Sequence, residues 1–169
     1  MQRELFVFAV LGALSASATA EEISGTIREV GGAGRASVEL KTEEGETLSL
    51  RGKTNQEELE LKNLGTLKVK LVGERDKQGL VVERYEILET GPEGQRPRLG
   101  LLASLMVGGE ARMIFVDERG QAELMPSGFS AKSKALIGAK VWMIGLKKGD
   151  RYTPLRFGVL RAPAENAAP

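Results

Sequence analysis

The feature of the sequence that most constrains its fold is the spacing of glycines in its two halves. Gly25 and Gly100 are 75 positions apart, and so are Gly45 and Gly120, each of which lies in a short charged turn. Glycine marks turns and close backbone approaches, so the same glycine spacing in two segments indicates two copies of one small unit. The sequence therefore predicts an internal duplication. The alternative is two unrelated β segments that share turn glycines.

Each half alternates apolar and polar residues with the period of a half-buried β-strand. In residues 67–71, three apolar side chains alternate with two lysines. Before that strand, Thr54-Asn-Gln-Glu57 fits the capping box of a short helix that Gly65 ends. In the second half, Ser130 is expected to cap a short helix over residues 131–137. The pattern predicts three strands, a helix and two strands in each half.

This order of elements is that of an OB fold, in which the helix lies between the third and fourth strands. The segment from Leu61 to Leu88 (LKNLGTLKVKLVGERDKQGLVVERYEIL) resembles the helix-end, glycine, strand, glycine, strand pattern common in bacterial OB-fold domains. The resemblance covers most of each half. It implies a mainly β protein of two tandem five-stranded OB-like barrels, each with a short helix between strands 3 and 4. For the second half, whose helix signal is weaker, an SH3-like barrel is the alternative.

The first residues have the composition of a secretory signal peptide. Arg3 precedes the uncharged apolar run Leu5–Leu14, and residues 18–20 (ATA) form a small-residue cleavage site. The apolar run is shorter than the roughly 20 residues that span a bilayer. We expect export to the periplasm or the cell exterior, with no membrane span; the alternative is an amphipathic or buried N-terminal helix. The expected organisation is a signal peptide at residues 1–20, a first OB-like barrel at 21–90, a linker at 91–97, a second OB-like barrel at 98–161 and a disordered tail at 162–169.

The chain contains no Cys and no His. Thiol nucleophiles, Ser-His-Asp relays and Cys or His zinc sites are therefore excluded. The three aspartates Asp76, Asp117 and Asp150 each lie near a glycine and are expected to stabilise turns. We predict no enzyme activity, no cofactor and no metal. The alternative is a carboxylate-dependent hydrolase of envelope polymer, with Glu39, Glu83 and Glu123 as its candidates.

The two halves differ in charge and in strand pattern. Residues 21–90 carry 11 basic and 15 acidic side chains, whereas residues 91–169 carry 12 and 7. In the second half, residues 113–116 and 141–144 are apolar at every position, and such strands need cover on both faces. We expect the outer face of the second barrel to pack on the first barrel or on a partner; the alternative is a locally thick core with no partner. The side chains concerned are Ile114, Val116, Trp142 and Ile144.

These features favour a non-catalytic exported binding or assembly module of the bacterial envelope, with its ligand and oligomeric state left open. A purely structural subunit and an oligonucleotide- or polyanion-binding OB protein are alternatives. The expected partner is an envelope protein or a polyanionic ligand. Nucleic acid is not favoured, because the first half is acidic and has one aromatic residue, Tyr85. The candidate partner surface comprises Lys132, Lys134, Lys140, Trp142, Lys147, Lys148, Arg151 and Arg156.

Overall fold

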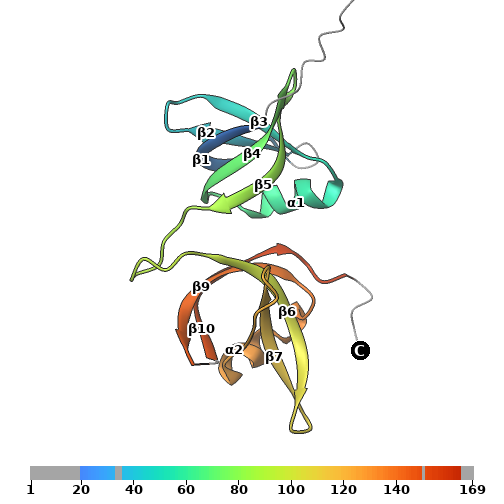
Figure 1. Cartoon of the computed structure of the whole chain (residues 1–169). Helices are drawn as coiled ribbons and strands as arrows, with labels where there is room; N and C mark the ends of the chain where they lie inside the picture. The colour runs from blue at the N-terminus through green and yellow to red at the C-terminus, as the bar shows by residue number, and fades with distance from the viewer. Residues whose placement is uncertain (1–19, 33–35, 150, 165–169) are drawn as a thin grey trace, which may run out of the picture.

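The computed structural model describes residues 20–32, 36–149 and 151–164, which form two closed β-barrels in tandem (Figure 1). The elements in chain order are β1 (Glu21–Val30), β2 (Ser37–Thr42), β3 (Thr47–Gly52), α1 (Asn55–Asn63), β4 (Lys68–Asp76), β5 (Gly79–Ile87), β6 (Arg98–Val107), β7 (Glu110–Asp117), β8 (Ala122–Leu124), α2 (Ser127–Lys132), η1 (Lys134–Leu136), β9 (Lys140–Lys148) and β10 (Arg151–Arg161). The predicted signal peptide, except for Ala20, lies outside the described residues, as do residues 165–169 of the predicted tail.

Both barrels have the strand order of an OB fold. The first closes as β1-β2-β3-β5-β4 and the second as β6-β7-β8-β10-β9, in the same relative order. A helix follows the third strand of each barrel, α1 in the first and α2 with η1 in the second. The prediction of a mainly β fold with two OB-like barrels is therefore confirmed, and the second barrel is not SH3-like.

The strand registers of the two barrels correspond pair by pair. Gly25 of β1 pairs with Thr42 of β2, and Gly100 of β6, 75 positions later, pairs with Asp117 of β7. A register shift also recurs in the last hairpin of each barrel. In the first it lies where Val72 and Gly73 of β4 pair with β5, and in the second where Ile144 and Gly145 of β9 pair with Arg156 and Pro154 of β10, which has one more shift near its end. Because pairing and irregularity both repeat, the structure supports an internal duplication.

The two helices begin differently. At α1, the backbone N–H of Glu57 donates to the Thr54 hydroxyl (3.2 Å) and the Glu57 carboxylate accepts from the Thr54 N–H (2.9 Å), so the predicted capping box is confirmed. At α2, the prediction that Ser130 caps the helix is wrong. Ser130 lies inside α2, which begins after Pro126, and its hydroxyl donates to the Pro126 carbonyl oxygen. Among the described residues, neither helix is long and apolar enough to cross a membrane.

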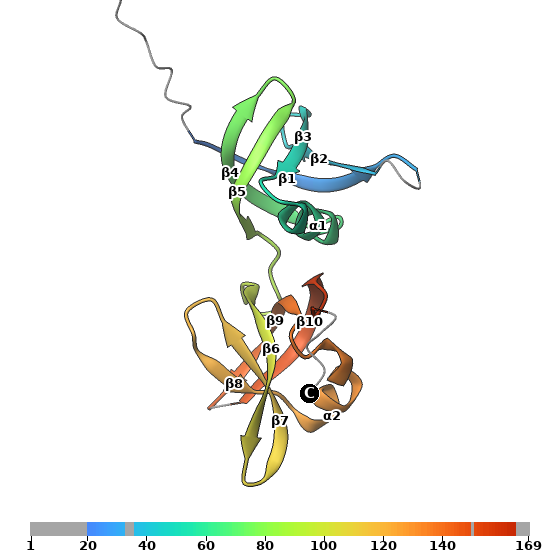
Figure 2. The same ribbon diagram turned by 90° about the vertical axis from the view of Figure 1, so that its right-hand side faces the viewer.

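Strand β9 contributes to two hydrophobic cores. Val141 and Met143 point into the second barrel, whereas Trp142, Ile144 and Leu160 of β10 belong to the core cluster of the first barrel. That cluster includes Leu61 and Leu64 from α1 and its C-cap, and α1 lies between the barrels in both views (Figures 1 and 2). The expectation that the second barrel packs on the first through an outer apolar face is confirmed for these strands.

Candidate functional site

The site on which OB folds bind their ligands is the outer face of the second and third strands, bordered by the loops between strands 1 and 2 and strands 4 and 5. In the second barrel these strands are β7 and β8. Phe115 of β7 and its partner Leu102 of β6 are fully buried inside the barrel. Because side chains alternate along a strand, the neighbours of Phe115 and Leu102 point outward.

On β6, β7 and β8 the outward side chains are mostly aliphatic. Strand register places Leu101 opposite Val116, and Ala103 opposite Ile114, which in turn pairs with Leu124. Leu101 and Leu105 of β6 are 43% and 48% exposed. Ala103, Val116 and Leu124 are half-buried, and Ile114 is only 8% exposed. We call this surface the apolar face, and it comprises Leu101, Ala103, Leu105, Ile114, Val116 and Leu124.

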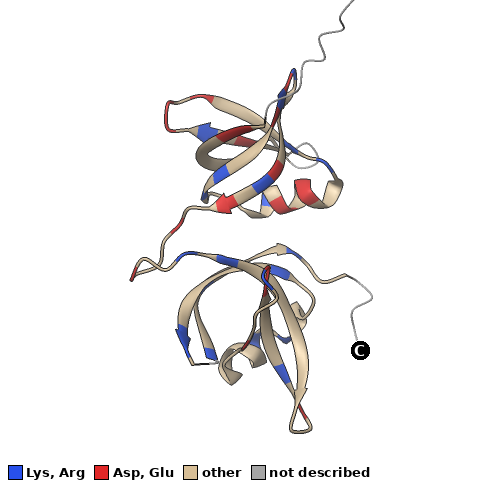
Figure 3. Cartoon of the chain, in the orientation of Figure 1, with Lys and Arg blue, Asp and Glu red and all other residues tan. Residues whose placement is uncertain are grey.

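The same face of the first barrel is polar. At the equivalent positions, Thr26 pairs with Lys41, and Arg28 pairs with Glu39, which pairs with Ser49. Figure 3 shows charged bands along the strands of the first barrel, while β6 is mostly uncharged. Since one fold and one register accommodate both surfaces, the aliphatic side chains of the second barrel are not required by the fold itself.

Cationic side chains border the apolar face. Arg151, at the start of β10, pairs with Leu124 of β8, and Lys148 lies opposite Arg151 across the β9–β10 turn. Arg112 lies opposite Leu105 and bonds to Glu110 at 3.1 Å. The second barrel therefore presents an aliphatic centre with a basic rim.

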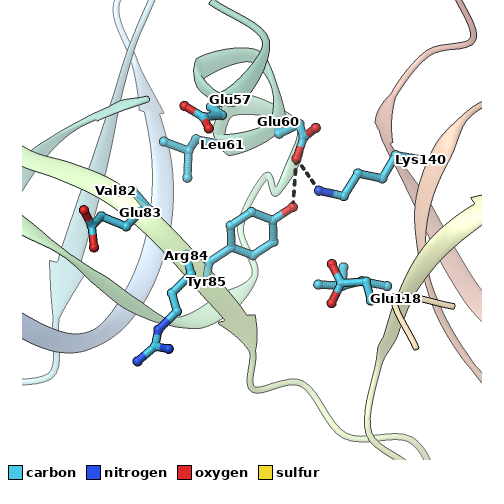
Figure 4. Close-up of a pocket in the computed structure, with 10 residues that line it drawn as sticks. Glu57, Glu60, Leu61, Val82, Glu83, Arg84, Tyr85, Glu118 and Lys140 are labelled. Atoms are coloured by element: carbon cyan, nitrogen blue, oxygen red, sulfur yellow. Dashed lines mark hydrogen bonds and ion pairs between the residues drawn. The ribbon is translucent and has the colours of Figure 1, made fainter. Parts of the chain in front are cut away.

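A cavity of about 340 Å³ lies at the junction of the two barrels (Figure 4). Glu60 of α1 is 5% exposed and accepts from Lys140 Nζ at 2.7 Å and from the Tyr85 hydroxyl at 3.2 Å. Arg161 lies 3.6 Å from its other oxygen. Burial, together with the Glu60 carboxylate, raises the pKa of the Tyr85 phenol, which therefore remains a hydrogen-bond donor. The Glu60 carboxylate at this cavity is buried and paired with cations of the same chain. We therefore assign the cavity to the contact between the two barrels and not to a ligand.

A second cleft, of about 530 Å³, is lined by a buried ionic cluster around Arg98. The Arg98 guanidinium donates to Asp117 at 2.7 Å and to Glu123 at 2.5 Å. Lys147 Nζ lies 2.7 Å from the other oxygen of Glu123, as an ion pair without hydrogen-bond geometry. Burial would raise the pKa of Asp117, but hydrogen bonds from Arg98 and from backbone amides outweigh it and hold that pKa below its usual value. The Asp117 carboxylate therefore remains ionised.

The structure does not bring the predicted surface residues together. Trp142 is only 7% exposed in the junction, where Lys140 binds Glu60 and Arg156 lies 3.6 Å from Glu89. Trp142 and Lys140 are thus turned toward the first barrel, whereas Arg156 remains half exposed. The others are dispersed: Lys147 beside Glu123, Lys148 and Arg151 at the β9–β10 turn, and Lys132 and Lys134 on α2 and η1.

The hydrolase candidates also lie apart. Glu39 is on the outer face of β2, Glu83 is on β5 beside Lys53 (2.7 Å), and Glu123 is on β8. The hydrogen bond from Lys53 lowers the pKa of Glu83, which is opposite to the raised pKa that a general acid needs. Among the described residues, no three carboxylates gather as ligands for a metal ion.

The turn role predicted for the aspartates is confirmed at two of them. Asp76 accepts from the backbone N–H of Gln78 at 2.7 Å, and Asp117 accepts from those of Arg119 and Gln121 at 3.0 and 2.8 Å. Asp150 lies outside the described residues.

Comparison with family models gave no match, and neither did comparison with curated proteins. Among solved structures, the chain is similar to a deletion mutant of the single-stranded DNA-binding protein from Thermus aquaticus, at 15% sequence identity and a TM-score of 0.26. The match covers 88% of this chain and 95% of that chain. Strand order and register define the class of this protein, which is a tandem OB-fold protein.

The expectation that nucleic acid is an unlikely partner is wrong. One matched structure is that of a single-stranded DNA-binding protein. The structure also places Arg151 and Lys148 beside the strands on which OB folds bind ligands. The sequence did not reveal this placement, because Arg151 meets Leu124 only through barrel closure.

Proposed function

We propose that this chain is a non-catalytic binding protein of the OB class that holds an extended polypeptide segment on the apolar face of its second barrel. The observation that carries the proposal is the contrast between two barrels of one register, one with a polar outer face and one with an aliphatic outer face. An aliphatic centre inside a charged rim is the usual anatomy of a protein interface. The basic rim favours segments with acidic flanks.

The ionic clusters support a role without catalysis. A general acid or base needs a pKa near the working pH and access to the substrate. Here Asp117 is held ionised by Arg98, and Glu60 is buried between its cationic partners. The Arg98–Asp117 pair joins strands of the second barrel, and the Glu60 pairs join the two barrels. None of these groups belongs to the proposed ligand surface.

The test is selection from a random peptide display library, with the chain expressed from Glu21, which retains all ten strands. We expect enrichment of apolar peptides with acidic flanks. Leu101→Lys places a charge on the apolar face, opposite Val116, and should weaken their binding by about tenfold or more.

The matched control is Thr26→Lys, which adds the same charge at the equivalent position of the first barrel. It should leave peptide affinity unchanged. Failure to enrich any sequence, or equal losses in the two variants, would refute the proposed face.

Oligonucleotide binding by the same face is the second candidate, and the cations at its rim favour it. Arg112, Lys148 and Arg151 border the two strands that OB folds use for this purpose. Phosphate contacts of this kind make affinity fall steeply with salt concentration.

Fluorescence anisotropy with labelled oligo(dT) tests this candidate. Binding at low salt that weakens in the double variant Lys148→Ala, Arg151→Ala, with a shallower salt dependence, would support it. No binding at low salt would dismiss it.

We further propose that the protein is exported from a bacterial cell, on the basis of the basic residue, apolar run and A-x-A site in residues 1–20. Expression of the full chain in a bacterial host should yield a periplasmic product whose N-terminal residue, by mass spectrometry, is Glu21. A cytoplasmic product that begins at Met1 would contradict export.

A further inference from the structure

The β6–β7 hairpin extends beyond the second barrel as a two-stranded ribbon (Figures 1 and 2). β6 pairs with β7 over Gly100–Val107 but with β9 only over Arg98–Leu101. Two more backbone hydrogen bonds join Leu102 to the residues before β9. Over Ala103–Val107, no other strand of the described residues pairs with the second edge of β6.

The direction of the backbone groups identifies the donors on this edge. The Leu102 N–H donates to the Ala139 carbonyl oxygen at 3.0 Å, and the Leu102 carbonyl oxygen accepts from the Gly138 N–H at 2.6 Å. In an antiparallel ladder, every second residue directs its N–H and C=O to the same side. Ser104 and Met106 therefore direct theirs to the open edge.

Nothing on this edge protects it from pairing. Residues 99–107 carry no charge and no proline, and Leu105, Met106 and Val107 are 48%, 66% and 40% exposed. Natural proteins usually protect a free edge with charges, proline or bulges. The first barrel does so, since Arg28 and Glu29 occupy the equivalent stretch of β1.

We infer that this edge of β6 pairs with the same edge of a second copy of the chain, antiparallel and centred on Leu105. A two-fold interface must be complementary to itself, and an uncharged strand meets its copy without like-charge repulsion. The formal net charge of the whole chain, +1, opposes association only weakly. A partner strand of a different protein is the competing occupant.

The register follows from the donors. Ser104 pairs with Met106 of the second copy as a hydrogen-bonded pair, and the two Leu105 residues face each other as a non-hydrogen-bonded pair, whose side chains lie closest. The ribbon thereby joins the sheets of the two copies, and the apolar faces become continuous. This inference goes beyond the proposed function and does not depend on the identity of the ligand.

Sedimentation equilibrium over a concentration series, with the chain expressed from Glu21, tests the inference. The unmodified chain should move from one to two chain masses. Met106→Pro removes an N–H from the open edge and leaves the β6–β7 bonds in place, so it should abolish the dimer. Leu105→Lys places two ammonium groups opposite each other and should do the same.

Two controls separate edge pairing from other effects. Met106→Ala removes the side chain but retains the N–H, and Leu101→Lys changes the apolar face where β6 is already paired with β9; both should remain dimeric. Far-ultraviolet circular dichroism establishes that each variant is folded. A chain that stays monomeric at every concentration, or a dimer that persists in both Met106→Pro and Leu105→Lys, would overturn the inference.

Discussion

At the scale of single residues, the buried charges of this protein are each held by more than one partner. Arg98 binds both Asp117 and Glu123, and Glu60 contacts both Lys140 and Arg161. The cost of removing two charges from water offsets most of what a buried ion pair gains, but a buried charge that loses its partner is strongly destabilising. Such clusters therefore select one geometry and add little net stability.

The lowered pKa of Asp117 links stability to pH. In the unfolded chain its pKa is near 3.8, and in the folded chain it is lower, so its contribution to stability is present above that value and is lost as pH falls through the folded pKa. Urea unfolding at a series of acidic pH values should show a smaller fall in Asp117→Asn than in the parent. Identical pH profiles would contradict the role of Asp117.

Gly100 lies where β6 crosses closely over β7. A Cβ at this position would collide with the carbonyl oxygen of Val116 and the ring of Phe115. Gly100→Ala should therefore lower the free energy of unfolding by about 2 kcal/mol, in the range of overpacked cores. Gly128→Ala, where the Cβ meets no atom within 4 Å, is the control and should change stability little. Chemical denaturation measures both.

At the scale of elements, the sequence predicts most of what depends on local chemistry. Alternation and glycine spacing locate the strands, and the Thr54–Glu57 pair locates α1. The start of α2 was missed because Pro126, which makes no side-chain cap, precedes it, and Ser130 bonds backward to Pro126 instead. The apolar face was not predicted as one surface, because its members meet only through cross-strand register.

The capping box of α1 gives the prediction at this scale. Thr54→Ala removes the hydroxyl that accepts from the Glu57 N–H and should cost about 1 kcal/mol of unfolding free energy. Asn55→Ala, one residue later and exposed, is the comparison and should be near neutral. Equal losses in the two variants would show that the cap is not what stabilises the helix start.

At the scale of the whole molecule, the second barrel is apolar on two outer surfaces with different uses. Trp142, Ile144 and Leu160 pack on the first barrel, and the Glu60–Lys140 pair lies beside them. The apolar face remains on β6–β8. The sequence indicated that the strands now seen as β7 and β9 need cover on both faces. The structure shows that the first barrel covers β9.

Trp142 is the only tryptophan and reports on the junction. Lys140→Glu places a like charge against Glu60 and should weaken the junction by about 3 kcal/mol, as broken buried pairs do. Looser packing exposes Trp142 to water, so its fluorescence emission should shift to longer wavelength in Lys140→Glu. Lys148→Glu makes the same charge change on an exposed turn and should leave the Trp142 emission unchanged. An unshifted spectrum in Lys140→Glu would contradict the junction described here.

The most direct test of the central claim, that the outer face of β6–β8 is an accessible apolar binding surface, is titration with the hydrophobic dye bis-ANS. Exposed contiguous apolar surface binds such dyes and raises their fluorescence. The account predicts strong dye binding that Leu101→Lys abolishes and Thr26→Lys leaves intact. Binding that is weak, or that the two variants reduce equally, would contradict it.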